Sequence, residues 1–194
     1  CCPAMEVALL IFLTLINALF AMSEMALASS RKARLQVMVE SGSDAARVAM
    51  ELHDNPTQFL STVQIGITSI SVLNGIVGDA AFSEPLAQWL HKVLPITERA
   101  AHVSSTGLVV FIITVITLIF GELVPKRLGL MYPETVASAV APAMNWVSRL
   151  TRPLVRLLTA CTQAILGLFG VREGQQRAVT EEEIAAQLEE GLDA

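Results

Sequence analysis

The chain has 194 residues, of which 53% are hydrophobic and only 16% are charged. Soluble domains carry about a quarter of charged residues, so this composition favours a protein of the lipid bilayer. The formal net charge is −5, and the 13 lysines and arginines are scattered rather than gathered into a basic stripe, which argues against nucleic-acid binding. The cysteines, Cys1, Cys2 and Cys161, have no metal-ligand spacing and imply no disulfide framework.

The first apolar segment covers residues 5–27 and is long enough to cross a bilayer as a helix. It has no basic start, and the cluster Arg31, Lys32 and Arg34 follows it directly, so we expect an uncleaved signal anchor. Because lysine and arginine mark cytoplasmic loops, the cluster predicts that span one ends in the cytosol and that the N-terminus lies outside.

The stretch 31–54 is predicted to form two surface helices, since its apolar residues recur among polar ones and Ser41–Gly42–Ser43 interrupts them. The dipeptide Asn55–Pro56 then restarts the chain, because proline is favoured at the first position of a helix. The second span is expected over residues 57–80, running outward.

Polar groups inside a span are costly unless they find partners, so they are functional candidates. Span one carries Asn17, Ser23 and Glu24, and successive helix residues point about 100° apart, so Ser23 and Glu24 need not share a role. Span two carries a stripe of small and polar residues that is best explained by close helix packing. Asn74 and Gly75 are poor helix residues, and we expect a local unwinding there that turns main-chain oxygens toward a cavity.

Residues 81–103 are expected to form an outer loop, and span three returns to the cytosol over 104–130. This span contains the carboxylate of Glu122. Pro125 has no N–H, so the carbonyl of Gly121 loses its helical donor and lies beside that carboxylate. Oxygen-rich clusters of this kind suit a hard cation such as Mg²⁺ or Na⁺.

The alternative for Glu122 is an ordinary ion pair with Lys126, four residues further along the helix, near the cytoplasmic interface. Glu122 lies about one helical turn inward of this lysine. We therefore expect the carboxylate at the floor of a cavity that opens to the cytosol.

A fourth apolar stretch, near 139–170, is expected to lie along the membrane interface rather than to cross the bilayer. Pro142 and Pro153 are expected to break it into short helices. A basic stripe typical of interfacial helices comes from arginines at spacings of three and four, Arg149, Arg152 and Arg156.

The sequence therefore predicts an all-α integral membrane domain over residues 1–170. It has three transmembrane helices and a cytoplasmic-side juxtamembrane belt of helices at about 133–169. Residues 171–194 are rich in glutamate and predict the start of an acidic helical linker in the cytosol.

Three motifs in this order resemble the CorC/CNNM magnesium transporters, and the resemblance covers essentially the whole chain. The motifs are Phe20-Ala-Met-Ser-Glu in span one, Asn55-Pro56 leading to Ser69-Ile-Ser-Val-Leu-Asn74-Gly75 in span two, and Gly121-Glu-Leu-Val-Pro-Lys126 in span three. The resemblance implies a dimeric transmembrane domain of the DUF21 type that binds dehydrated Mg²⁺. It also implies export of that ion across the plasma (inner) membrane in exchange for Na⁺. In full-length relatives the linker leads to a pair of cytosolic CBS modules that bind ATP.

The resemblance also implies a ligand set for the metal. Its members would be the side chains of Ser23, Asn74 and Glu122, completed by Ser69 and by main-chain oxygens near Phe20, Ile70 and Gly121, with structural kinks at Gly75 and Pro125. One carboxylate with neutral oxygens leaves the bound site net positive, which is weak enough for the ion to leave.

Other readings of the sequence remain open at this point. Oxygen ligands also accept Co²⁺ or Mn²⁺, whereas the lack of histidine and cysteine at the expected site argues against Zn²⁺. A regulatory or scaffolding membrane protein would use the same polar groups only to hold helices together. An enzyme is not expected, because the motifs supply no nucleophile with a base and an orienting group.

Overall fold

The computed structural model describes residues 3–169, which form helices joined by short turns and contain no strand. The fold divides into two units between Arg152 and Pro153. In chain order the elements are α1 (Pro3–Ser29), α2 (Lys32–Glu40), α3 (Asp44–Asp54), α4 (Pro56–Val93), α5 (Glu98–Leu118), the π-helix η1 (Ile119–Leu123), α6 (Val124–Met131) and α7 (Pro133–Leu168).

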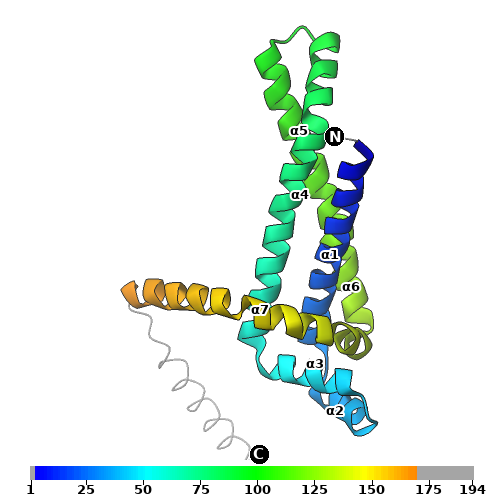
Figure 1. The fold of residues 1–194 in the computed structure, drawn as a ribbon, viewed down its shortest axis with the longest axis vertical. Helices are drawn as coiled ribbons and strands as arrows, with labels where there is room; N and C mark the ends of the chain where they lie inside the picture. Colours follow the sequence, from blue (N-terminus) through cyan, green and yellow to red (C-terminus); the bar gives the residue numbers. More distant parts are fainter. Residues whose placement is uncertain (1–2, 170–194) are drawn as a thin grey trace, which may run out of the picture. The chain divides into compact units, whose positions relative to one another are not determined.

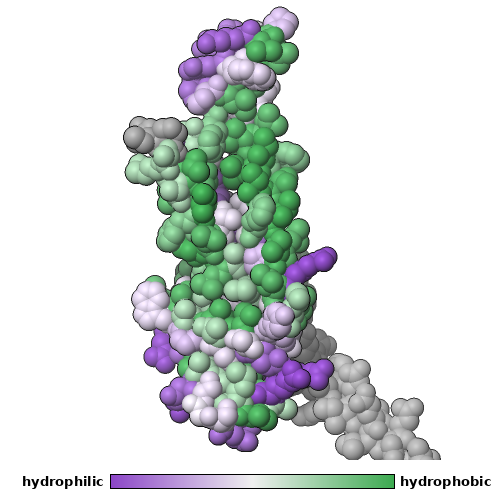
Figure 2. Space-filling model, turned by 90° about the vertical axis from the view of Figure 1, so that its right-hand side faces the viewer, coloured by the Kyte–Doolittle hydropathy of each residue, from purple (hydrophilic) through white to green (hydrophobic). Residues whose placement is uncertain are grey.

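Three helices are long and apolar enough to cross a membrane, which confirms the three predicted spans. They cover Ala4–Ser29, Pro56–Val93 and Glu98–Met131, and the last runs through α5, η1 and α6. These helices lie side by side in Figure 1. Figure 2 shows the surface that results, a broad hydrophobic belt between two hydrophilic ends. The chain is therefore a multi-pass, all-helical membrane protein.

The connection between the second and third spans is a helical hairpin, so the expected loop over 81–103 is wrong. α4 continues through Pro85 to Val93, and α5 begins at Glu98, where the Thr97 side chain caps it by accepting from the Ala100 N–H at 3.3 Å. A proline costs only one hydrogen bond, and two paired helices support each other outside the apolar belt. The hairpin extends past the N-terminal end of α1 (Figure 1).

α4 is helical through Asn74 and Gly75, so the unwinding expected there is not seen, while the kink at Gly75 stays a prediction. The Asn74 side chain is buried and reaches hydroxyl groups on α1 and α5, which holds this part of α4 in place. Tertiary packing thus overrides the weak helix propensity of the two residues. The irregular backbone lies instead in η1, directly before Pro125.

The other end of the spans carries α2 and α3, and we call it the basic end because Arg31, Lys32 and Arg34 lie there. The expected helix pair is confirmed: it breaks at Gly42, whose φ of +94° suits glycine, and the Ser43 hydroxyl caps α3. One apolar core joins α1, α2, α3, α4 and the first part of α7. Its members are Phe20, Ala21, Ala26, Leu27, Leu35, Ala49, Leu52, Phe59, Val63, Ile67, Ile70, Ala137, Val140, Ala141 and Met144.

α7 runs without interruption through Pro142 and Pro153, so the expected break into short helices is wrong. Each proline removes one N–H donor, and the helix on either side keeps its other hydrogen bonds. Among the described residues α7 is not one of the helices apolar enough to span a membrane. The three arginines of its basic stripe are exposed. The predicted linker, 171–194, lies outside the described residues.

Candidate cation site

A layer of polar side chains crosses the bundle where α1, α4 and the third span meet. Asn74 of α4 is 1% exposed, and its Nδ2 lies 3.4 Å from Thr14 Oγ1 on α1 and 3.5 Å from Thr117 Oγ1 on α5. Asn17, also 1% exposed, donates from Nδ2 to the Gly121 carbonyl at 3.0 Å. We call Thr14, Asn17, Asn74, Thr117 and Gly121 the polar layer.

Two oxygens of the polar layer have no hydrogen-bond partner within the described part of the chain. They are Oδ1 of Asn17 and Oδ1 of Asn74, and both are buried. Buried acceptors nearly always accept a hydrogen bond, and inside a membrane an unpaired acceptor cannot accept one from bulk water. Each amide donates on one side and leaves an acceptor free on the other. These free acceptors are the type of oxygen that a hard cation coordinates.

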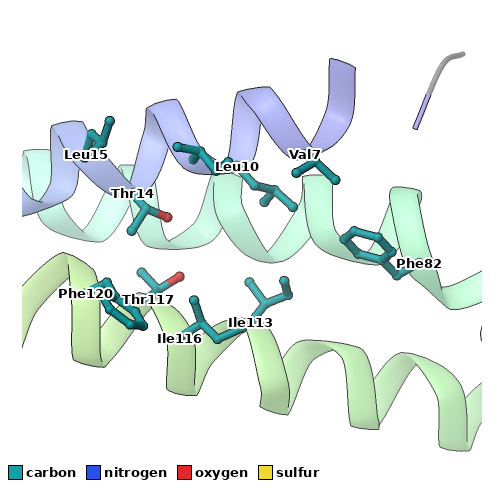
Figure 3. Close-up of a pocket in the computed structure, with 10 residues that line it drawn as sticks. Val7, Leu10, Thr14, Leu15, Phe82, Ile113, Ile116, Thr117 and Phe120 are labelled. Carbon is teal, nitrogen blue, oxygen red and sulfur yellow. The ribbon is translucent and has the colours of Figure 1, made fainter. Parts of the chain in front are cut away.

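A groove of about 470 Å³ lies beside the polar layer, on its hairpin side. Thr14 and Thr117 face each other across the gap between α1 and α5 (Figure 3). The rest of the lining is apolar and includes Leu10, Phe82 and Ile113. The two threonines therefore separate an apolar groove from the buried amides.

The π-turn of η1 places the Gly121 carbonyl against α1. The Val124 N–H bonds to the Ile119 carbonyl, five residues back, and Pro125 follows immediately. Gly121 is buried, and a Cβ there would lie 3.0 Å from the Asn17 amide nitrogen. The carbonyl that was expected to lose its helical donor thus receives one from a side chain of another helix. Single π-turns inside α-helices are frequent at functional sites.

Toward the basic end, Lys126 lies between two carboxylates from different helices. Its Nζ donates to Glu122 Oε1 at 2.9 Å and lies 3.3 Å from Glu24 Oε2. The second contact is an ion pair without hydrogen-bond geometry. Glu24 Oε2 is buried, and no described residue donates a hydrogen bond to it. The side chains are 24% to 29% exposed. The ion pair between Glu122 and Lys126, which was the alternative interpretation of Glu122, is therefore present. Lys126 also pairs with Glu24.

A close backbone approach fixes this charged triad of Glu24, Glu122 and Lys126. A Cβ added at Gly129 would lie 2.6 Å from the Met22 carbonyl oxygen and 3.1 Å from the Ala26 nitrogen. Only glycine permits α6 to lie this close to α1. The contact holds Lys126, one turn before Gly129, within reach of Glu24.

The structure places the expected ligands in different surroundings. Ser23 is fully buried and donates to the Phe20 carbonyl at 2.8 Å, whereas Ser69 is exposed on α4. Asn74 lies in the polar layer, and Glu122 in the charged triad. In the part of the chain that the structure describes, no hydrogen bond or ion pair joins Ser23, Asn74 and Glu122 directly. Their grouping into one coordination shell stays a prediction.

Sequence reasoning singled out Asn17 and Glu24 but gave them no role, and it passed over Thr14 and Thr117. A signal existed in span one: Thr14, Asn17, Ala21 and Glu24 follow one another at spacings of three, four and three. Such a spacing puts them on one helical face. The face is polar except for the small Ala21, and it connects the polar layer to the charged triad.

Comparison with known proteins identifies the family. Residues 8–194 match the family model of the Cyclin M transmembrane N-terminal domain, CNNM. The "UPF0053 protein sll0260" of Synechocystis sp. is 43% identical over 190 residues, which are 98% of this chain and 42% of that protein. The "Polyamine export protein" of Salmonella typhimurium is 34% identical over 176 residues, 91% of this chain and 39% of that protein. The "Polyamine export protein" of Escherichia coli strain K12 is 30% identical over 186 residues, which are 96% of this chain and 41% of that protein.

The chain spans about two-fifths of the length of these relatives. The family match includes the first span from residue 8 onward, both other spans, the polar layer and the charged triad. On this evidence the chain belongs to the CNNM family and carries its transmembrane N-terminal domain.

Proposed function

We propose that this chain is the membrane domain of a transporter that exports Mg²⁺ from the cytosol. The observation that carries the proposal is the pair of buried oxygens, Asn17 Oδ1 and Asn74 Oδ1. They lie between spanning helices and have no hydrogen-bond partner among residues 3–169. A buried acceptor without a donor costs free energy, and a hard cation supplies the missing partner. The Glu122 carboxylate follows directly after the Gly121 carbonyl and adds one negative charge.

The ligand set remains the one that the resemblance implies, with Asn17 added. Ser23 stays eligible, because a hydroxyl that donates to the Phe20 carbonyl keeps lone pairs for a cation. Main-chain oxygens near Phe20, Ile70 and Gly121 would complete the shell. Ser69 is the weakest member of the set, because its side chain is exposed.

We further propose that the basic end faces the cytosol of a cell whose plasma membrane holds the protein, with the N-terminus outside. Arg31, Lys32 and Arg34 at one end of α1, and Arg127 at the end of span three, support this orientation. Na⁺ entry would drive Mg²⁺ release on the outer side, and Mg²⁺ transport that continues unchanged without Na⁺ would contradict that step. Dimer formation, and ATP binding by CBS modules, are proposals for the whole protein.

A second candidate cargo is a polyamine. The relatives from Salmonella typhimurium and Escherichia coli strain K12 both carry the name "Polyamine export protein". The charged triad supports this candidate, because the Lys126 side chain is a primary ammonium on a four-carbon chain and is held between Glu24 and Glu122. Putrescine presents the same group on the same length of chain, so its end would fit the same pair of carboxylates.

Calorimetric titration of the purified protein separates these candidates. Mg²⁺ and putrescine are titrated in turn into the wild type, Asn74→Ala and Glu122→Gln, with Glu40→Gln as the control, since Glu40 is an exposed carboxylate on α2. For a Mg²⁺ site, both site variants should weaken Mg²⁺ binding by about tenfold or more, and the control should not. For a polyamine site, only Glu122→Gln should weaken putrescine binding. A wild type that binds neither would refute both cargoes and favour the scaffolding alternative.

A further inference from the structure

The charged triad contains a cation that belongs to the protein. Lys126 Nζ lies 2.9 Å from a Glu122 oxygen and 3.3 Å from a Glu24 oxygen. The two carboxylates come from η1 and α1, so the ammonium joins two spans rather than neighbouring turns of one helix. All three side chains are about three-quarters buried.

Resting on the proposed function, we propose that the Lys126 ammonium is a tethered counter-cation, which the transported cation must displace from Glu24 and Glu122. With Lys126 in place the triad has a net charge of −1. A divalent ion added to it would leave a net charge of +1 with two cations side by side, which is unfavourable in a partly buried site. Once the ammonium moves away, two carboxylates balance one divalent ion.

The surroundings allow the lysine side chain to move while its helix stays in place. Gly129 packs α6 closely against the backbone of α1, and the exchange needs no movement of α6. The lysine side chain has a flexible stem of four carbons and is 26% exposed. Rotation of the stem therefore takes the ammonium toward the exposed side and frees both carboxylates.

The Lys126 ammonium stabilises the transporter when no cargo is bound. Two carboxylates without a cation between spanning helices would repel each other in a medium of low dielectric constant. The ammonium removes that cost when cargo is absent, so the protein can return without an ion. Glu24 thereby becomes the second carboxylate of the cargo site.

The test is Mg²⁺ titration, with putrescine as a second titrant, into Lys126→Gln and Lys126→Arg, with Arg127→Gln as the matched control. Arg127 is the next residue, is exposed and carries the same charge. Lys126→Gln should bind the cargo about tenfold more tightly than the wild type, because the competing charge is gone. Lys126→Arg should restore the weaker binding, and Arg127→Gln should leave it unchanged. Equal or weaker binding by a folded Lys126→Gln would overturn the proposal and indicate a structural ion pair.

If Lys126→Gln does not fold, the variant Glu24→Gln/Lys126→Gln keeps the net charge of the triad at −1. It should fold and bind the cargo within a few-fold of the wild type, because one carboxylate and the competing cation are removed together. Loss of binding in this variant would overturn the proposal. A wild type that binds neither titrant refutes the proposed function instead, so the two failures are distinguishable.

Discussion

Replacing Gly129 by alanine should separate α6 from α1. The new Cβ would lie 2.6 Å from the Met22 carbonyl oxygen, and real Cβ atoms hardly ever come within 3.0 Å of another heavy atom. The difference, 3.0 − 2.6 Å, requires a shift of at least about 0.4 Å, and both partners are backbone atoms that cannot rotate away. Overpacking of this kind costs about 1–3 kcal/mol. The shift also moves Lys126 away from Glu24, since both belong to the same helix contact.

The matched control is Gly107→Ala on α5, where an added Cβ meets no atom of the described residues within 4 Å. Both substitutions gain the same helix propensity, about 0.8–1 kcal/mol, so that gain cancels when the two variants are compared. Thermal unfolding in detergent, followed by far-ultraviolet circular dichroism, should place Gly129→Ala below Gly107→Ala by about 1–3 kcal/mol. Equal stability of the two variants would refute the backbone contact between α6 and α1.

Two further substitutions test other contacts. Asn17→Asp keeps the size of the side chain but replaces the donor to the Gly121 carbonyl by an acceptor, so it should cost about 1–3 kcal/mol near neutral pH. The loss of stability should be smaller at low pH, where a protonated carboxyl donates again. An unchanged melting temperature in Asn17→Asp would count against the hydrogen bond to the Gly121 carbonyl. Ser43→Ala removes the cap of α3 and should cost about 1 kcal/mol in the same assay, whereas the exposed Ser41→Ala should change little.

The elements that could be predicted from the sequence depend on local properties. The lengths of the apolar segments predicted the three spans. Gly42 and Pro56 indicated where α2 ends and where α4 begins. The hairpin could not be predicted, because the polar and charged residues after Ala80 are typical of a loop, whereas a helix that is paired with another can continue into water. Local composition predicts where a chain leaves the apolar belt better than where its helix ends.

The candidate site depends on contacts between distant segments, which a single sequence does not supply. The donor of the Gly121 carbonyl is Asn17, 104 residues away, and the second carboxylate at Lys126 comes from α1. The unwinding expected at Asn74 and Gly75 was wrong for the same reason, because partners on two other helices stabilise the helical form of Asn74. Residue types and motifs indicated the polar groups, while their pairing required the fold.

The π-turn also changes which face of the third span points toward the neighbouring helices. The buried face of this span recurs every fourth residue, at Ala101, Ser105, Val109, Thr117, Gly121, Pro125 and Gly129, with the half-buried Ile113 in the remaining place. In a regular helix each step of four overshoots a full turn by about 40°, so such a face drifts steadily away from its neighbour. The wide turn of η1 takes up about one extra residue, or about 100° of that drift. η1 therefore behaves as a one-residue insertion, and removing a residue there would rotate Lys126 and Gly129 together off the surface of α1.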